Sequence, residues 1–386
     1  MDNSQQCKGN SFVIDTSSIG ASDISKKAMP IEFLDFNVYG LSRKDLEARL
    51  SENSISAVHA KSVFRSLYKD LAPASDASHH FPRQVEAYLN TLDLSIPLSI
   101  VSEQRSSYDR SIKFAVKLHD DQKVEMVLMP ESKRITLCIS SQVGCAQGCT
   151  FCHTGRMGLL RNLKPSEIIG QVYLANLWIK SNPDWLAQCK LAPNLRITNI
   201  VFMGMGEPLD NVESVSKALD ILTDPFGLYL AKRKISVSTA GHIDGLDALL
   251  ENHPDVMLAI SVHSATDSER SKIMPINRRF PLDTLIQKLR NLPLQQKNGL
   301  LLQYTLIQGV NDSDDHALKL VNLVKGMNVK INIIPLNPVG PSRLKGPTTE
   351  RLGSFRKVIH DSGIRALVRY SKAQDIAGAC GQLVNP

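Results

Sequence analysis

Two kinds of hydrophobic pattern alternate along the chain from Arg134 onward. Short runs rich in β-branched residues are typical of buried strands, and we predict strands over residues 134–139, 197–203, 234–238, 256–262, 300–307, 329–335 and 364–370. Longer segments repeat apolar residues at helical spacing, and we predict helices over residues 166–180, 212–222, 282–291, 312–325 and 348–362. Strands that alternate with helices form parallel sheets with right-handed crossovers. We therefore predict an α/β fold whose strands curl into a partial barrel.

The pattern is helical before this region, from Pro30 to about Leu94. Leu46 and Leu50 share one face of a predicted helix, and Ser42 is its predicted N-cap. A second helical segment, residues 59–69, places basic side chains on one face: Lys61, Arg65 and Lys69. Such a face is usually only solvated, although in a small domain ahead of an enzyme core it is also suited to RNA phosphates.

Strict alternation replaces the helical pattern over residues 112–118 and 123–129, which predicts a β-hairpin. The first residues of the chain are polar and have little periodicity. We therefore predict four parts: a flexible leader (1–28), a helical domain (29–100), a β-hairpin linker (101–133) and a barrel (134–386).

Three cysteines follow the first barrel strand at close spacing: Cys145, Cys149 and Cys152. Three thiolates at this spacing can converge on a [4Fe-4S] cluster and leave one iron open to a small molecule. With Phe151 before the third cysteine, the pattern resembles that of the radical S-adenosylmethionine (SAM) enzymes, in which the open iron chelates SAM. A zinc site and three unrelated buried thiols are the alternatives.

The overall composition narrows the class of protein only modestly. Seven cysteines, an odd number with three of them clustered, favour a reducing cytoplasm over a secreted disulfide framework. The net charge of +7 favours an anionic partner such as nucleic acid without establishing one. No apolar run reaches the ~18 residues of a membrane span, and no signal peptide is recognisable. We expect a soluble cytoplasmic protein that does not bind membranes.

Polar residues gather where the predicted strands end, which is where barrel enzymes hold their chemistry. Gly206 and Glu207 follow the second strand, and a backbone without side-chain bulk beside one carboxylate suits a ligand that carries an ammonium group. The other candidates at strand ends are Ser238, Ser261, Val262, His263 and Asn337. Each alone is more often part of a turn or satisfied by neighbouring backbone.

Six segments of the chain together resemble the RlmN and Cfr family of radical-SAM RNA methyltransferases. They are residues 137–145, 161–163, 167–172, 204–209, 237–241 and 379–383. The resemblance runs from about Leu34 to Leu383. It implies a partial (β/α)6 radical-SAM barrel, a helical accessory domain and a SAM site formed by the strand-end residues.

The resemblance also implies a role for two cysteines outside the cluster. One SAM methylates the thiolate of Cys380, and a second SAM is cleaved to a radical that takes hydrogen from this methyl group. The resulting methylene radical adds to an adenine carbon, Glu125 accepts the ring proton, and Cys138 attacks Cys380 to leave a transient disulfide. Without the resemblance, Cys138 and Cys380 would be read as small buried hydrophobic residues and Glu125 as an exposed strand residue.

The resemblance predicts methylation of carbon 2 of an adenosine in 23S ribosomal RNA, with transfer RNA as a further candidate. It implies a [4Fe-4S] cluster, two SAM molecules per turnover, an electron donor such as flavodoxin and a monomeric enzyme. Three alternatives remain: Cfr-like methylation of carbon 8, a radical-SAM enzyme for another substrate, and a catalytically silent RNA-binding factor. Two features depart from the family pattern: His153, after the third cluster cysteine, and a long connection over residues 181–195.

Overall fold

The computed structural model describes residues 37–73, 81–292, 300–340 and 342–384. All of these lie in one unit of the chain, Asp35–Pro386. The predicted leader lies outside the described residues. Within the described ranges, no helix has the length and apolar character needed to cross a membrane.

A ten-stranded sheet forms the framework, in the order β1-β2-β3-β4-β7-β8-β9-β10-β11-β12. Its first four strands pair antiparallel and are β1 (Leu98–Arg105), β2 (Ile112–Leu118), β3 (Lys123–Glu131) and β4 (Arg134–Ile139). From β4 on, all neighbours are parallel: β7 (Asn199–Phe202), β8 (Ile235–Thr239), β9 (Met257–Ser261), β10 (Leu300–Leu306), β11 (Val329–Pro335) and β12 (Arg365–Val368). The seven predicted barrel strands are confirmed, as is their parallel arrangement.

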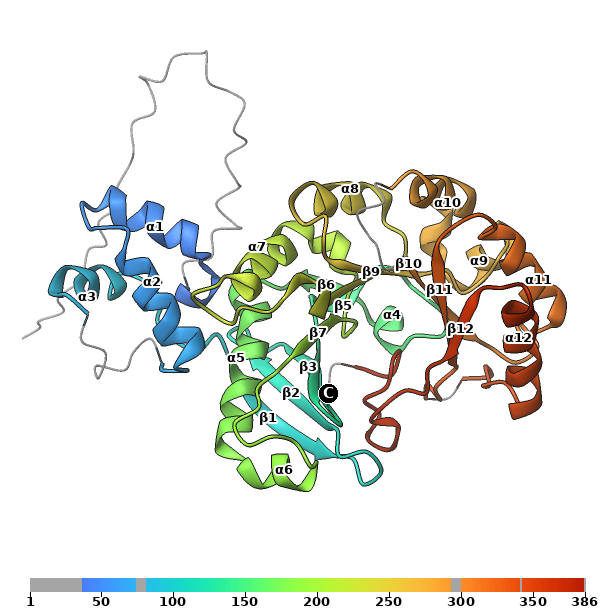
Figure 1. Ribbon diagram of the computed structural model, residues 1–386, viewed down its shortest axis with the longest axis horizontal. Helices are drawn as coiled ribbons and strands as arrows, with labels where there is room; N and C mark the ends of the chain where they lie inside the picture. The colour runs from blue at the N-terminus through green and yellow to red at the C-terminus, as the bar shows by residue number, and fades with distance from the viewer. Residues whose placement is uncertain (1–36, 74–80, 293–299, 341, 385–386) are drawn as a thin grey trace, which may run out of the picture. The chain divides into compact units, whose positions relative to one another are not determined.

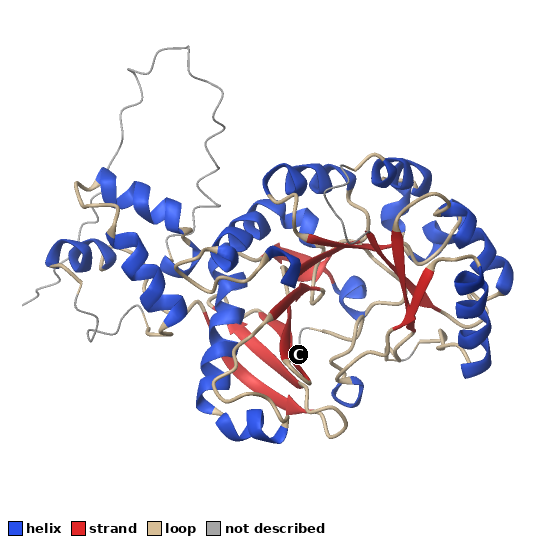
Figure 2. Ribbon diagram, viewed as in Figure 1, coloured by secondary structure: helices blue, strands red, loops and turns tan. Residues whose placement is uncertain are grey.

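Helices connect the parallel strands and lie along the outer side of the curved sheet (Figures 1 and 2). They are α5 (Pro165–Ser181), α6 (Pro183–Gln188), α7 (Val212–Thr223), α8 (Ile243–Asn252), α9 (Asp267–Ile273), α10 (Leu282–Arg290), α11 (Asp314–Leu323) and α12 (Thr349–Asp361). The five predicted barrel helices correspond to α5, α7, α10, α11 and α12. The partial barrel is therefore confirmed.

The N-terminal part of the described chain is helical, with α1 (Arg43–Glu52), α2 (His59–Phe64) and α3 (Arg83–Leu89). Ser42 caps α1 as predicted, because its side chain accepts a hydrogen bond from the Asp45 N–H while the Asp45 carboxylate accepts the Ser42 N–H. Leu46 and Leu50 are buried on the predicted face. A tilted ring contact between Tyr39 and Tyr173, 4.8 Å between centroids, joins this part to α5.

The structure also contains elements that the sequence did not predict. They include β1 and a small hairpin formed by β5 (Gln142–Cys145) and β6 (Gly158–Asn162). The short helix α4 (His153–Met157) lies between these two strands in the sequence. Strand β1 is an edge strand whose outer half is exposed, and its register shifts between Ile100 and Ser102. A bulged, polar edge strand has no clear hydrophobic alternation, which explains why it was not recognised.

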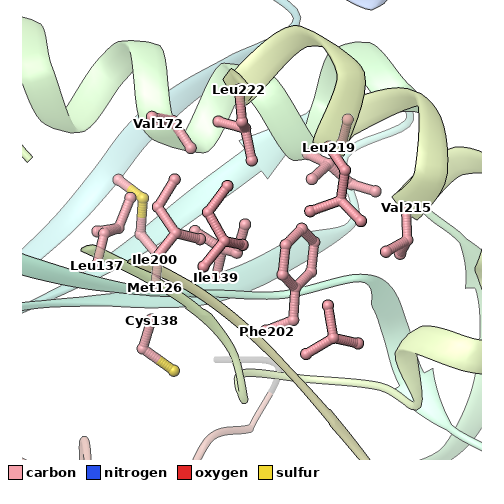
Figure 3. Close-up of a cluster of buried hydrophobic side chains, with 14 of the residues drawn as sticks. Met126, Leu137, Cys138, Ile139, Val172, Ile200, Phe202, Val215, Leu219 and Leu222 are labelled. Atoms are coloured by element: carbon pink, nitrogen blue, oxygen red, sulfur yellow. The ribbon is translucent and has the colours of Figure 1, made fainter. Parts of the chain in front are cut away.

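Strand β4 shows how one segment serves both the core and the site. Leu137 and Ile139 point into a buried apolar cluster that includes Phe202 and Leu219, whereas Cys138 points to the opposite side of the sheet (Figure 3). Successive side chains of a strand alternate between its faces. Each fully buried apolar side chain of this size contributes about 1.5–3 kcal/mol, so one face of β4 anchors the strand that presents Cys138 on the other.

Candidate active site

Three cysteines lie in one short loop between β5 and α4. Cys145 ends β5, and Cys152 directly precedes α4. The close β5–β6 pairing requires glycine at position 144, because its φ is +80° and a Cβ there would lie 1.9 Å from the Gly158 carbonyl oxygen. The structure therefore brings the three predicted cluster ligands to one loop.

The environment of the three thiols in this loop is better explained by a shared metal cluster than by three independent buried cysteines. Burial, together with the charges of Glu207 and Cys152, raises the pKa of Cys145 to about 12. Burial also raises the pKa values of Cys149 and Cys152, and the neighbouring thiols add to this effect. Three neighbouring thiolates in a buried loop need a positively charged centre among them, and an iron–sulfur cluster is such a centre.

The separation of the three thiols suits a cluster better than a single zinc ion. Among the described residues, no three His, Cys, Asp or Glu side chains are close enough together to hold a single metal ion. A cubic [4Fe-4S] cluster distributes its ligands over separate irons, so its sulfur ligands lie farther apart than those of one zinc ion.

The turn after β7 approaches the cysteine loop very closely. Gly206 has a φ of +100°, and a Cβ there would lie 2.6 Å from the Cβ of Gln142 in β5. The buried Glu207 carboxylate accepts the N–H groups of Ala240 (2.7 Å) and Leu209 (3.1 Å). Burial nevertheless raises the Glu207 pKa to about 7. The predicted glycine–glutamate pair thus holds a carboxylate in a fixed position next to the cysteines.

Ser238 and Ser261 lie at the ends of neighbouring strands and share one partner. Their hydroxyls donate to the Oε1 atom of Gln303, at 3.1 and 3.2 Å. Gln303 lies on β10 and was not among the predicted site residues. Its signal in the sequence is a polar residue inside the otherwise apolar run of β10.

Val262 and His263 continue β9 toward the cysteine loop. The Val262 N–H donates to the Gln303 carbonyl at 3.0 Å. The His263 ring contacts the Phe151 ring edge-on, with centroids 4.9 Å apart. Its Nδ1 accepts the Thr305 N–H at 2.9 Å, so the neutral ring carries its proton on Nε2. Burial, with the nearby Arg270 charge, lowers the His263 pKa to about 3, and the ring is neutral at physiological pH.

Asn337 follows β11, and its amide is engaged by the C-terminal segment. Its Nδ2 donates to the Ser371 hydroxyl and to the Cys380 carbonyl, both at 3.0 Å. Gln374 donates to its Oδ1 at 3.2 Å. In this structure Asn337 therefore positions the backbone of Cys380.

The C-terminal segment joins Cys380 to the cysteine loop. The His153 N–H donates to the Gly381 carbonyl at 2.7 Å, and the Thr154 hydroxyl donates to the Leu383 carbonyl at 2.7 Å. The Cys380 side chain is exposed, and its thiol lies close enough to both Cys138 and Cys152 to raise their pKa values further beyond the effect of burial.

Glu125 is buried beneath the same segment and is not an exposed strand residue. Its Oε1 pairs with the Lys113 ammonium at 3.0 Å, and its Oε2 accepts the Val384 N–H at 2.9 Å. Lys113 also donates to the Ala377 carbonyl at 3.4 Å. Lys113 was missed in the sequence because it lies in an alternating strand where a lysine normally faces solvent.

Cys138 and Cys380 line one cavity of about 410 Å³. The cavity is bounded by β4 and β7, by β11 and β12, and by the C-terminal segment. Three cationic side chains also line it: Arg134, Arg369 and Lys372. Tyr370, which is 66% exposed, lies beside them. The arrangement offers two thiols, positive charge and an aromatic ring to one bound molecule.

Comparison with known proteins gives a family for this geometry. The radical SAM superfamily model matches residues 139–321. A dual-specificity RNA methyltransferase RlmN from Anaeromyxobacter sp. (strain Fw109-5) is 39% identical over 92% of this chain and 89% of its own length. The corresponding protein of Campylobacter lari is 38% identical over 84% of this chain and 91% of its own length. The chain belongs to the RlmN family of radical-SAM methyltransferases.

A solved structure agrees with this assignment. The crystal structure of a radical SAM methyltransferase from Sphaerobacter thermophilus has a TM-score of 0.82 and 38% identity, and the match covers 90% of this chain and 98% of that one. As an RlmN-family enzyme, the chain uses a [4Fe-4S] cluster and SAM as cofactors. The cysteine loop and the strand ends beside it fit both groups.

The two departures from the family pattern lie in different places. The His153 backbone binds the C-terminal segment, and its ring lies beside Gly340. The connection over residues 181–195 contains α6, in which Trp185 is buried and donates to the Arg110 carbonyl at 3.1 Å. The connection therefore packs against the turn between β1 and β2 and, through a ring contact of Trp185 with Trp178, against α5.

Proposed function

We propose that this enzyme methylates carbon 2 of an adenosine in 23S ribosomal RNA, and also in transfer RNA, through a methyl group carried on Cys380. The observation that carries the proposal is the shared cavity of Cys138 and Cys380, two cysteines distant in sequence that no cluster requires. The relatives in this family are named dual-specificity RNA methyltransferases. A flavodoxin-type electron donor and a monomeric enzyme belong to the same proposal.

Cys145, Cys149 and Cys152 hold the cluster in this proposal, and the strand ends hold SAM. When bound, the two cofactors supply the radical chemistry and the methyl group. Glu207 and the Gly206 backbone would bind the amino group of SAM. The remaining SAM contacts come from Ser238, Ser261, Val262, His263 and Asn337.

The two cavity thiols have different environments that suit different tasks. Cys380 is exposed and accessible for methylation. Burial, with the charge of Cys380 nearby, raises the pKa of Cys138 well above its usual range, so Cys138 remains a thiol until the late step. It then loses its proton and attacks the Cys380 sulfur. The bond from that sulfur to the methylene carbon on the base breaks, and its electron pair stays with the carbon, which takes up a proton to become the methyl group. The resulting disulfide is reduced by an external thiol.

Glu125 is the proton acceptor for the adenine ring in this proposal. It shares the inner sheet face with Cys138, because Val127 of β3 is directly opposite Cys138 and side chains two residues apart lie on the same face. The Lys113 ammonium compensates the charge of the buried carboxylate. Lys113 is therefore a positioning residue for Glu125.

We infer that the N-terminal helices contact the RNA away from the cavity, as an accessory domain of about residues 29–100. The side chains of Lys61, Arg65 and Lys69 are exposed, while Val63 and Leu67 are buried on the other side. Exposed cations in a row are suited to phosphates. Other exposed basic groups for the same role are Arg233, Lys234, Arg278, Arg279, Arg343 and Lys345.

Deletion of the gene, followed by complementation, tests the proposed product. Nucleosides from purified ribosomal and transfer RNA are analysed by mass spectrometry. We expect 2-methyladenosine to disappear on deletion, to return with the wild-type gene, and to stay absent with Cys380→Ala. Gene-dependent 8-methyladenosine would instead establish the Cfr-like alternative, and unchanged nucleosides would refute adenosine methylation.

A further inference from the structure

Arg270 of α9 is the largest side chain with no exposed surface among the described residues. Its guanidinium donates to the carbonyls of Ala240 (2.6 Å), Ser261 (3.0 Å) and Val262 (3.0 Å). It also donates to the Asn277 Oδ1 at 2.6 Å. All four acceptors are neutral, so the hydrogen bonds satisfy the donors without neutralising the charge.

The charge itself has no direct partner. Among the described residues, no carboxylate forms an ion pair with Arg270, and only Cys149 and Asp267 are acidic groups near enough to act on it. Burial lowers the Arg270 pKa to about 10, which leaves the group charged at neutral pH. A buried cation without a directly paired anion is strongly disfavoured, which indicates that an anion belongs beside it.

The cysteine loop is the nearest place for such an anion. Cys149 packs in one small buried cluster with Ala240, Ile273 and Met274. The Ala240 carbonyl binds Arg270, and the Met274 N–H donates to the Arg270 carbonyl at 2.7 Å. The Thr150 N–H donates to the Ile273 carbonyl at 3.0 Å, which fastens the loop to the end of α9.

We propose that Arg270 is the counter-ion of the iron–sulfur cluster and raises its reduction potential. The three thiolates make the bound cluster anionic, and Arg270 supplies a fixed cation behind Cys149. As a positioning residue it also fastens the ends of β8 and β9, where Ser261 and Val262 lie. The inference rests on cluster binding and is independent of which nucleotide is methylated.

The physical reason is the charge added by reduction. A one-electron donor such as dithionite adds one negative charge to the cluster, and a cation held nearby in a low-dielectric site favours that added charge. Replacement of Arg270 by a neutral residue should therefore make the midpoint potential more negative. The Asp267 carboxylate is a second negative charge near Arg270, so its removal in Asp267→Asn should make the midpoint potential more positive.

The experiment is an EPR-monitored redox titration of the reconstituted full-length protein, without RNA and without SAM. Arg270→Gln is expected to shift the midpoint to more negative values, Arg270→Lys to stay near the wild type and Asp267→Asn to shift it the opposite way. Arg290→Gln is the matched control, because Arg290 also donates to two backbone carbonyls, those of Leu323 and Lys325, but is exposed. Its midpoint should not change.

Two results would overturn the proposal. The first is an Arg270→Gln protein that holds a full cluster with the wild-type midpoint. The second result is a midpoint potential of Asp267→Asn that is unchanged or more negative than that of the wild type. It can be measured even if Arg270→Gln does not fold. Because no RNA is present, failure here is distinguishable from failure of the proposed methylation, which the nucleoside analysis tests separately.

Discussion

Two residues divide the proposed reaction between an exposed thiol, which lines the cavity, and a buried acid on the neighbouring strand β3. Cys380 is accessible, whereas Glu125 is enclosed by Lys113 and the Val384 N–H. A carboxylate that accepts a carbon-bound proton must be held near the ring and kept from bulk water. The Lys113 pair and the backbone hydrogen bond supply that restraint.

Glu125→Gln tests the proton acceptor directly. The amide has nearly the same shape but cannot take the proton, so we expect methyl transfer to RNA to fall by about 10²–10⁴-fold. Methylation of Cys380, which needs no base at the adenine, should continue and is measured by mass spectrometry of the Cys380 peptide. Full RNA methylation by Glu125→Gln would remove Glu125 from the mechanism.

His263 predicts an acid sensitivity of the fold. Burial lowers its pKa to about 3 in the folded protein, against about 6.5 in the unfolded chain. Between these values the unfolded chain binds the proton and the folded protein does not, so stability is present above about pH 6.5 and is lost as the pH falls below it. Urea unfolding from about pH 7.5 to about pH 5 should show this loss.

His263→Asn should reduce that pH dependence, because asparagine keeps an acceptor for the Thr305 N–H but does not titrate. His360→Asn is the control, since His360 lies exposed on α12. An equally steep loss of stability in wild type and His263→Asn would contradict the assignment.

At the scale of elements, the β5–β6 hairpin carries Cys145, a proposed cluster ligand, and one arginine, Arg161, holds the hairpin in place. Arg161 of β6 forms a two-point ion pair with the buried Glu167 of α5, at 2.8 Å for each contact. It also binds Asp120 in the turn between β2 and β3 at 2.7 Å. This network joins the hairpin to a helix and to the antiparallel strands.

Arg161→Met should therefore loosen the hairpin and leave the Glu167 carboxylate without its main partner. Loss of hydrogen bonds to a buried charge predicts a cost of about 2–3 kcal/mol in unfolding free energy. Denaturant unfolding gives the stability, and iron content after reconstitution gives the effect on the cluster. Arg351→Gln is the control, because Arg351 on α12 is partly exposed. Equal stability and equal iron content in the two variants would show that the network does not hold the loop.

The barrel elements could be predicted because their signals are local. Each parallel strand from β4 to β12 is a short apolar run, and the five recognised helices repeat apolar residues at helical spacing. Helix α9 was missed because only one of its seven residues, Ile273, is apolar. Helix α8 carries Gly245 in its first turns, which weakens a helical signal.

The site could be predicted only in part, for a related reason. The cysteine spacing is a local signal, whereas the meeting of Cys138 with Cys380 comes from the fold and was expected only through the family resemblance. Lys113 and Arg270 carry no pattern of their own, and the only local signal of Gln303 is that it interrupts the run of apolar residues in β10. Their places follow from the packing of strands and helices that are distant in the sequence.

At the scale of the whole molecule, the cavity lies where both ends of the barrel sheet and the C-terminal segment meet. Arg369 and Lys372 of this cavity are suited to the phosphates beside a bound adenosine. Arg369→Gln should weaken RNA binding and reduce the salt slope of the binding constant by about one. Arg356 is exposed on α12, and Arg356→Gln should change neither the RNA affinity nor the salt slope. An unchanged slope for Arg369→Gln would exclude Arg369 as a phosphate contact.

The most direct test of the whole account is to look for the covalent intermediate on Cys380. Cys138→Ala protein is incubated with its RNA, SAM and a reducing system, then digested and analysed by mass spectrometry. The account predicts an adenosine joined through one carbon to the peptide that contains Cys380, and no such adduct with Cys138→Ala/Cys380→Ala. Free methylated RNA at the wild-type level, without any adduct, would contradict it.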